Sequence, residues 1–567
     1  MRTLKQKEFT QQFVHNNRVN YFVALFAQLI TSAAMIASAP VMMYSFDAMA
    51  QADYNLLKIV LAAALLLLIV YGIMGVVQKV FVNRYMKKAL SQFKGYIFEK
   101  ILKKSIEEFG SYSSGKFINA FSNDLSLIEQ NYLRGNLLII QNLVMITIAI
   151  SVMTYLNPVF MLIVVASCII PIIVALLIGN RLTSKEKKTS DENEGFIDQV
   201  KDLINGFIII KSFKAEKKAL ELFSQRNFSL EKTKGDRRET NDAVVLASMV
   251  ANTVVIIVIV LIGAFFVISG TMTIGAVIAF IQLSNYLVYP IREIVPLWSS
   301  RKASIALIDK LTDIIRAEPR LRNRKEIGSL NQHIRLQDVS FSYDGKKNVL
   351  SGINITFEKG KSYAIVGTSG SGKSTLLQLI MGYNSGYGGS IFIDHTELRE
   401  IDLDSLYDVI SVVQQNVFLF HSSIKNNITM FTEFEDQKVA CAVGRSGLAG
   451  LIAEKGLDYN CGEGGCNLSG GEKQRVSIAR CLLRETPVLL MDEATASLDN
   501  TTAFELTNEI LDIRELTRIV VTHKLEEKLI QKFDEIIVIH AGAVAERGTF
   551  TQLAAEKGYF YSLLINR

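Results

Sequence analysis

Six long apolar runs, all before residue 300, constrain the fold more than any other feature of the sequence. They lie at residues 21–45, 56–82, 137–156, 159–179, 246–268 and 274–297. A helix needs about 20 apolar residues to cross a bilayer. Because lipid offers the backbone no hydrogen bonds, each run is expected to be helical. The sequence therefore predicts a multi-domain membrane protein whose first part is an all-α bundle of six transmembrane helices.

The distribution of positive charge predicts how these helices are oriented. The stretches 84–123 and 181–240 are rich in Lys and Arg, whereas the turns at 47–55, 157–158 and 269–273 contain neither. Basic loops tend to stay on the cytoplasmic side of a membrane. Both long loops are therefore expected in the cytoplasm, and the even number of crossings places both termini there too.

The second part of the chain has a different pattern. From His333 onward, short apolar segments alternate with glycine turns and amphipathic segments, which is typical of an α/β domain. A basic segment, 318–325, precedes it. We expect a transmembrane domain over residues 1–317, a linker over 318–330 and the α/β domain over 331–567.

A phosphate-binding loop (P-loop) lies in this α/β domain, between a strand-like run (363–366) and a helix-like run (376–380). Its residues are Gly367, Thr368, Ser369, Gly370, Ser371, Gly372, Lys373, Ser374 and Thr375. The glycines let backbone N–H groups approach phosphate oxygens at a helix N-terminus. Lys373 would neutralise the β- and γ-phosphates, and Ser374 would bind Mg²⁺. The motif predicts a nucleotide and Mg²⁺ as cofactors.

A second apolar run, 487–491, ends in two acids, Asp492 and Glu493. After a P-loop this is the Walker B pattern, in which Asp492 would hold Mg²⁺ through water. Glu493 would act as the general base on the attacking water. The alternative, a strand end with solvated acids, has less support because the P-loop lies upstream.

Leu468-Ser-Gly-Gly-Glu-Lys-Gln474 is the rarer motif. With the P-loop, it makes the chain resemble the ATP-binding cassette (ABC) transporters, as an exporter-type half-transporter, over essentially the whole sequence. In that family Ser469, Gly470 and Gly471 serve the ATP held by the opposite subunit. The resemblance therefore implies a homodimer, or a heterodimer with a second ABC half-transporter, that encloses two ATP molecules.

The resemblance assigns roles to four further residues. Tyr343 would stack on adenine, and His523 would contact the γ-phosphate. Gln415, rather than the adjacent Gln414, would sense Mg²⁺ and the attacking water. Asp499, in Ser497-Leu-Asp499, matches the loop (D-loop) that communicates between the two ATP sites.

Three segments are expected to couple the two domains. Residues 206–213 and 117–127 resemble the cytoplasmic loops that dock on the ATPase, and 462–465 resembles an exporter loop that contacts them. The alternative for the first two is a helix pair that packs on itself or lies at the membrane interface. Cys461 and Cys466 flank this glycine-rich turn, but without a further Cys or His pair they predict no metal site.

Polar residues on the last apolar run are candidates for the transport path. They are Gln282, Asn285, Tyr286, Tyr289 and Arg292, and most of them share one helical face. Polar groups facing lipid are costly, so this face is expected to line the bundle interior or a water-filled path. Hydrogen bonding between helices is the equally weighted alternative.

The resemblance implies ATP-driven export of an apolar or amphipathic substrate, such as a drug, lipid or peptide, across a bacterial plasma membrane. The cassette would lie in the cytoplasm. An importer built on the same frame, for example for siderophore uptake, and an ATP-gated channel are the alternatives. Nucleic acid is not an expected partner, because the chain lacks a basic, aromatic recognition surface.

Overall fold

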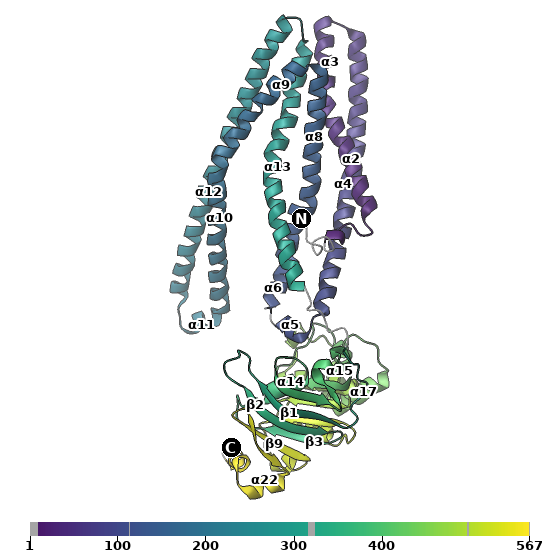
Figure 1. Cartoon of the computed structure of the whole chain (residues 1–567), viewed down its shortest axis with the longest axis vertical. Coiled ribbons are helices and arrows are strands. Elements are labelled where there is room, and N and C mark those ends of the chain that lie inside the picture. The colour runs from purple at the N-terminus through teal and green to yellow at the C-terminus, as the bar shows by residue number, and fades with distance from the viewer. Residues whose placement is uncertain (1–9, 111, 113, 316–323, 496–497, 566–567) are drawn as a thin grey trace. The chain divides into compact units, whose positions relative to one another are not determined.

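The computed structural model describes residues 10–110, 112, 114–315, 324–495 and 498–565. They form two compact units (Figure 1). The first comprises Met1–Leu102 and Ser113–Arg316, and the second comprises Lys103–Tyr112 and Ala317–Arg567. The second unit therefore includes a short segment from the middle of the first.

The first unit is entirely helical, which confirms the predicted fold class for this part of the chain. Its helices are α2 (Arg18–Ile36), α3 (Ser38–Gln51), α4 (Tyr54–Leu102), α6 (Ser114–Asn119), α7 (Leu125–Leu127), α8 (Gly135–Leu156), α9 (Pro158–Ser167), α10 (Ile169–Asn205), α11 (Phe207–Ser212), α12 (Glu216–Ile268) and α13 (Ile274–Ile315). Two π-helical turns, Ala120–Asp124 and Ile128–Arg134, flank α7.

Five helical segments of the described residues are long and apolar enough to cross a membrane, and Pro158–Pro171 is a shorter apolar helix at the fourth predicted crossing. Several helices continue well beyond their apolar runs. The 53 residues of α12 correspond to about 80 Å at 1.5 Å per residue, more than twice the hydrocarbon thickness. Such a helix is longer than the hydrocarbon core of a bilayer requires.

The second unit contains two sheets. The antiparallel sheet has the order β2-β1-β4-β5, and the larger sheet has the order β10-β9-β3-β8-β7-β6. The strands are β1 (His333–Phe341), β2 (Leu350–Glu358), β3 (Ser362–Val366), β4 (Gly388–Ile393), β5 (Thr396–Glu397), β6 (Ile410–Val413), β7 (Val488–Asp492), β8 (Thr517–Val521), β9 (Glu535–His540) and β10 (Ala543–Gly548). The larger sheet is parallel except for the β9–β10 pair.

Helices cover this parallel sheet, so its central strand is buried on both faces. Tyr363 and Ile365 of β3 belong to one hydrophobic cluster, and Ala364 and Val366 belong to another. Continuous apolar strands of this kind are typical of α/β domains. The helices of the unit are α5 (Ile106–Gly110), α14 (Lys373–Ile380), α15 (Leu403–Val409), α16 (Ile424–Thr429), α17 (Asp436–Arg445), α18 (Ala449–Lys455), α19 (Gly470–Leu483), α20 (Asn500–Leu511), α21 (Glu527–Ile530), α22 (Phe550–Glu556) and α23 (Tyr559–Ile565), with 3₁₀ turns at Leu398–Glu400 and Glu463–Gly465.

A short helix from the first part of the sequence, α5, belongs to the second unit. Ser385 donates two hydrogen bonds to Glu107 Oε2, from its backbone N at 3.1 Å and from its Oγ at 2.8 Å. Residues 117–127 instead lie in the first unit, where Phe117 and Leu125 are buried. Leu125 belongs to a hydrophobic cluster of this unit, whereas Ile118 in the same segment is exposed.

Candidate active site

The P-loop joins the carboxyl end of β3 to the start of α14, and its shape requires glycine at two positions. Gly367 has φ +156°, and a Cβ there would lie 2.2 Å from Ile539 O. Gly372 has φ +103°, and a Cβ would lie 2.6 Å from Leu350 Cδ2. Side chains at these positions would clash with the neighbouring strands, so the loop can close tightly only with glycine.

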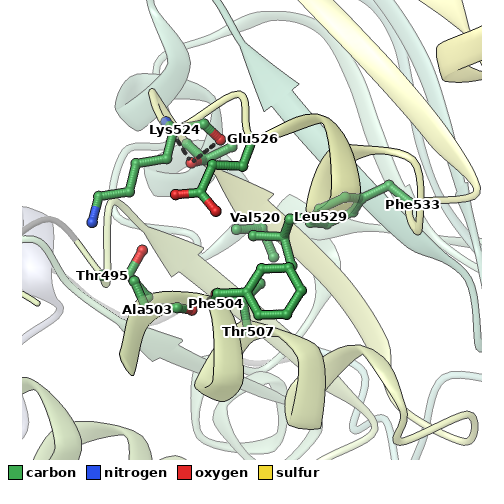
Figure 2. A pocket seen from close by; sticks show the side chains of 10 residues that line it. Thr495, Ala503, Phe504, Thr507, Val520, Lys524, Glu526, Leu529 and Phe533 are labelled. Atoms are coloured by element: carbon green, nitrogen blue, oxygen red, sulfur yellow. Dashed lines mark hydrogen bonds between the residues drawn. The ribbon is translucent and has the colours of Figure 1, made fainter. Parts of the chain in front are cut away.

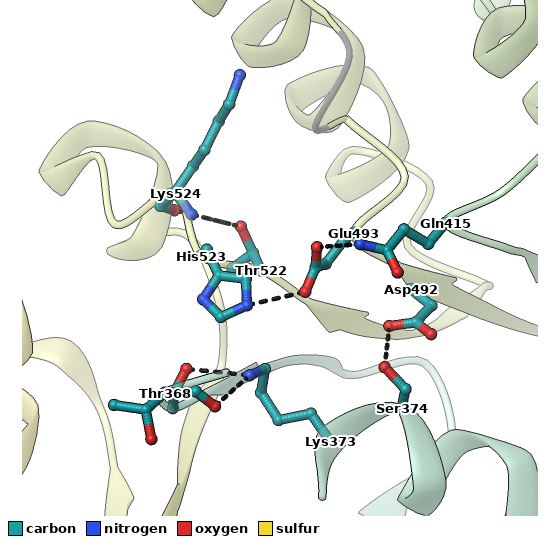
Figure 3. Close-up of polar contacts among 10 residues, drawn as sticks. Thr368, Lys373, Ser374, Gln415, Asp492, Glu493, Thr522, His523 and Lys524 are labelled. Carbon is teal, nitrogen blue, oxygen red and sulfur yellow. Dashed lines mark hydrogen bonds and ion pairs between the residues drawn. The ribbon is translucent and has the colours of Figure 1, made fainter. Parts of the chain in front are cut away.

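Lys373 carries a buried positive charge inside this loop. Its Nζ donates to Gly367 O at 3.0 Å and to Thr368 O at 2.9 Å (Figure 3). Burial lowers the pKa of the ammonium, and the nearby Glu493 and Asp492 oppose that shift. Among the described residues Lys373 forms no ion pair, and its ammonium bonds only to these two backbone carbonyls. Such a cation favours an incoming anion.

The loop also leaves a hydroxyl without a partner. Ser371 is 4% exposed, and its Oγ makes no hydrogen bond among the described residues. A buried hydroxyl in that condition is costly unless a ligand pairs with it. The unpaired Ser371, the open glycine backbone and Lys373 together fit a bound polyphosphate.

Ser374 and Asp492 meet at the carboxyl edge of the parallel sheet. Ser374 Oγ donates to Asp492 Oδ1 at 2.9 Å. Burial raises the pKa of Asp492, and the Ser374 hydrogen bond and the Lys373 charge partly offset that effect. A hydroxyl and a carboxylate are oxygen ligands of the type Mg²⁺ prefers, so the pair fits this ion. A cavity of about 270 Å³ adjoins them and is also lined by Gln378 and Gln415.

Glu493 follows β7 and has the left-handed conformation, with φ +50°. Its backbone N donates to Val521 O at 3.1 Å, which fixes the turn against β8. Its carboxylate accepts a hydrogen bond from Gln415 Nε2 at 2.8 Å and lies 2.8 Å from His523 Nε2 (Figure 3). Non-glycine residues in this region are uncommon and are found more often at functional sites. The three residues predicted to be catalytic are thus in direct contact.

The contacts also distinguish the two adjacent glutamines. Gln414 Nε2 donates to Tyr383 OH at 3.3 Å, away from the acids, whereas Gln415 reaches Glu493. Tyr343 is 60% exposed, and its hydroxyl lies 3.2 Å from Thr375 Oγ1 and donates to Gln378 Oε1 at 3.0 Å. Its ring is therefore held beside the start of α14, where an adenine could stack on it.

The signature motif forms the start of α19. Glu472 N donates to Ser469 Oγ at 3.3 Å, and Ser469 N donates to Glu472 Oε2 at 2.6 Å, so the two residues form a capping box. Burial alone would raise the pKa of Glu472, but the Ser469 hydrogen bonds and two nearby cations lower it. Ser469 and Gly470 are exposed, and Gly471 is half-buried. No hydrogen bond among the described residues joins them to the P-loop of the same chain.

Asp499 caps α20, accepting from Thr502 N at 2.9 Å. Ser497, of the same predicted loop, lies outside the described residues. Cys461 is buried and Cys466 is exposed, and no group of three or more metal-binding side chains occurs in the part of the chain that the structure describes.

The polar residues predicted for the transport path divide into two groups. Tyr286 is buried, donates from its hydroxyl to Met35 O at 3.0 Å and lies 3.4 Å from Gln282 Nε2. Tyr286 and Gln282 thus form hydrogen bonds between and within helices, which is the alternative that the sequence left open for this face. Asn285, Tyr289 and Arg292 are exposed on α13.

Two contacts were not predicted from the sequence. One is the Glu107–Ser385 pair, between residues 278 positions apart. The other joins Lys524 Nζ to Leu498 O at 3.1 Å. The Glu107–Ser385 pair lies outside the motifs, and the Lys524–Leu498 bond joins a residue next to His523 to the Ser497-Leu-Asp499 motif, a pairing that the spacing within each motif does not indicate.

Comparisons with known proteins agree with this geometry. The family description "ABC transporter transmembrane region" matches residues 21–291, and "ABC transporter" matches residues 350–496. An ABC transporter ATP-binding protein of Bacillus subtilis (strain 168), YwjA, is 31% identical and the match covers 82% of both chains. An ATP-dependent lipid A-core flippase of Desulfotalea psychrophila is 27% identical over 99% of this chain and 100% of its own length.

A bacterial Atm1-family ABC exporter solved with ATP bound has the same fold. It superposes with a TM-score of 0.84 over 97% of this chain and 98% of its own, at 21% identity. The chain therefore belongs to the ABC transporter family, as a multi-pass membrane region fused to a cassette that binds ATP and couples its hydrolysis to transport.

Proposed function

We propose that this protein is a dimeric exporter that moves an amphipathic substrate across a bacterial plasma membrane. The observation that carries the proposal is the meeting of Lys373, Asp492, Glu493 and His523 at one sheet edge. This ATPase edge belongs to a chain whose other unit consists of membrane-length helices. The basic cytoplasmic loops support a cytoplasmic location for the cassette and both termini.

In the proposed reaction, the P-loop and Lys373 bind the phosphates, and Ser374, Asp492 and Gln415 would hold Mg²⁺. Bound Mg²⁺ would supply charge neutralisation to the phosphates. Glu493 takes a proton from the attacking water at its carboxylate. His523 and Gln415, both at 2.8 Å from that carboxylate, orient it. Tyr343 supplies a ring for adenine.

The exposed signature motif supports an assembly of two chains. Ser469, Gly470 and Gly471 present a helix N-terminus, which attracts anions, and their own P-loop already has Lys373. In the proposed dimer each signature motif completes the ATP site of the other subunit, and Asp499 communicates between the sites. The self-paired form is the simpler one, because neither the Glu493 base nor the signature motif is degenerate.

The substrate class rests on α13 and on the relatives. Asn285, Tyr289 and Arg292 form an exposed polar face in a largely apolar unit, which suits a cargo with both characters. The matched relatives bear names such as lipid A-core flippase and putative multidrug export protein. These names favour export over the importer alternative, and flux measured in inverted vesicles would distinguish the two directions.

The experiment for the dimer mixes two inactive chains. Lys373→Ala removes the P-loop charge, and Ser469→Arg blocks the signature motif. Each variant alone has two damaged sites. In a mixed dimer isolated with two tags, one site carries both lesions and the other is intact, so ATPase activity should return to about half that of the parent. Activity no higher than that of either variant alone would contradict the shared site.

A further inference from the structure

Lys524 joins two loops of the ATPase unit that come from different strands. It follows His523 at the end of β8, and its Nζ donates to Leu498 O at 3.1 Å. Leu498 immediately precedes Asp499, the cap of α20. We infer that Lys524 is a positioning residue that holds the Leu498–Asp499 segment in a fixed place relative to His523.

The His523 side of this link is restrained by a hydrogen bond across the turn. Lys524 N donates to Thr522 Oγ1 at 3.0 Å, which closes a tight turn around His523 (Figure 3). That turn directs the His523 ring to Glu493, 2.8 Å away. Displacement of the Lys524 backbone would therefore change the angle at which His523 meets the carboxylate.

The Leu498 side is also restrained. Leu498 N donates to Thr495 O at 3.2 Å, and Asp499 accepts from Thr502 N at 2.9 Å. Leu498 itself is 6% exposed and packs in the hydrophobic core. The Leu498 carbonyl that accepts the Lys524 hydrogen bond therefore lies between two restrained positions of the backbone. The bond can thus fix the position of Lys524 relative to this segment.

Figure 2 shows Lys524 and Thr495 on the wall of a small cavity between α20, α21 and β8. The cavity measures about 10 Å³ and is lined on the opposite side by apolar groups including Leu529 and Phe533. Among the described residues Lys524 forms no ion pair, so its charge is committed to the Leu498 carbonyl. Bonds from a charged donor are about twice as strong as neutral ones.

The consequence for the reaction rests on the proposed function, in which the Asp499 segment communicates with the site on the partner subunit. Lys524 then links His523, which contacts Glu493 in the ATP site of its own subunit, with the Leu498–Asp499 segment, which serves the ATP site of the partner subunit. Loss of the Lys524 charge should slow the catalytic step at bound ATP and leave ATP affinity nearly unchanged, because no hydrogen bond or ion pair of the described residues joins Lys524 to the P-loop.

The test compares full-length variants in lipid nanodiscs. Lys524→Met keeps the aliphatic stem and removes the donor, and Lys524→Arg restores a charged donor. Lys528→Met, at an exposed position on α21, is the matched control. We expect Lys524→Met to lower kcat about tenfold with KM for MgATP changed less than about twofold, and Lys524→Arg to recover most of the loss. Lys528→Met should equal the parent.

A double-mutant cycle shows whether the effect passes through the Asp499 segment. If it does, Lys524→Met should cost less than about twofold in an Asp499→Ala background. Three results would overturn the inference. The first is an equally large fall in kcat when Lys524→Met is made in the Asp499→Ala background, and the second is a parental kcat for Lys524→Met. The third is a fall in both kcat and melting temperature that Lys524→Arg does not reverse. Glu493→Gln, measured alongside, reports on the ATPase proposal separately.

Discussion

The catalytic edge of the parallel sheet and the exposed face of α13 both gather polar side chains, but only the catalytic edge fixes them. Glu493 is held at 2.8 Å by Gln415 and lies 2.8 Å from His523, and Ser374 is bonded to Asp492. On α13, Tyr289 and Arg292 make no hydrogen bond or ion pair that the described residues supply.

This difference reflects two kinds of task. Phosphate chemistry requires groups that are already in place, because reorientation during the reaction adds to the barrier. A transport path must accept and release its cargo, so side chains without fixed partners are suited to it. Substitutions at the catalytic edge should therefore change the rate of ATP hydrolysis, whereas substitutions on the α13 face should change its stimulation by substrate.

The largest effect is expected at the fixed edge. Glu493→Gln keeps the size of the side chain but replaces one acceptor oxygen with an amide donor and removes the base, so hydrolysis should fall about 10²–10⁴-fold. ATP binding should stay near that of the parent, because the P-loop is unchanged. Single-turnover hydrolysis and nucleotide binding, measured on the same preparation, check both parts.

Glu509→Gln, on the exposed side of α20, is the control and should behave as the parent. Retention of parental turnover by Glu493→Gln would remove this residue from its assigned role and with it the contrast between the regions.

The first unit also contains one fixed polar group, and it should matter for stability rather than turnover. Asp47 is 8% exposed, and its carboxylate accepts from Thr273 Oγ1 at 3.0 Å and from Gly275 N at 3.1 Å. Asp47→Ala would leave both donors unpaired, at a cost of about 1–3 kcal/mol per buried group. The melting temperature in detergent should fall accordingly.

Asp53→Ala is the matched comparison, because the Asp53 carboxylate also accepts from backbone N–H groups but at an exposed turn. Its effect should be smaller. Equal destabilisation by the two variants would show that burial of the Asp47 contacts adds nothing.

A moderate effect is expected where α5 joins the ATPase unit. Glu107→Ala removes the acceptor of two Ser385 hydrogen bonds, and Ser385→Ala removes one of the two. Basal ATPase activity should change less than about twofold, while substrate moved per ATP falls several-fold more for Glu107→Ala than for Ser385→Ala. Parallel flux and ATPase assays in vesicles measure this ratio, and an unchanged ratio for both variants would exclude α5 from coupling.

The smallest effect is expected on the α13 face. Tyr289→Ala and Arg292→Ala should alter stimulation of the ATPase by an identified substrate about two- to fivefold, with basal activity unchanged, since binding energy is shared among several contacts. Asn285→Ala tests a third position on the face. If all three variants respond to the substrate as the parent does, this face does not line the path.

The nucleotide residues could be predicted because their chemistry constrains a short, continuous stretch of chain. Gly367 and Gly372 are fixed by backbone geometry, and Lys373 follows directly. Parallel strands then bring Asp492 and Val521 to the same edge, so Ser374 meets Asp492, and His523 meets Glu493, without sequence proximity. The fold class could be predicted for similar reasons, from the length of the apolar runs.

The contact between α5 and Ser385 could not be predicted in the same way. Residues 117–127 and α5 both combine apolar and charged side chains, and periodicity does not say which apolar face is covered by its own unit. Phe117 and Leu125 pack inside, whereas Glu107 finds its partner 278 residues away. Tyr286 presents the same problem. Its place in the helical repeat is compatible both with a buried hydroxyl bonded to a backbone carbonyl and with an exposed one, so the sequence does not distinguish them.

The long uninterrupted helices give the membrane unit a mechanical advantage. Proline occurs inside α13, at Pro290 and Pro296, whereas α4 and α12 contain none within their 49 and 53 residues. A straight helix of about 80 Å that tilts by about 5° at one end moves its other end by about 7 Å. A small tilt at one end of such a helix can therefore become a displacement at the other end that is comparable with the width of a transported molecule. This holds only while the helix stays straight, because a bend within it would reduce the displacement of the far end.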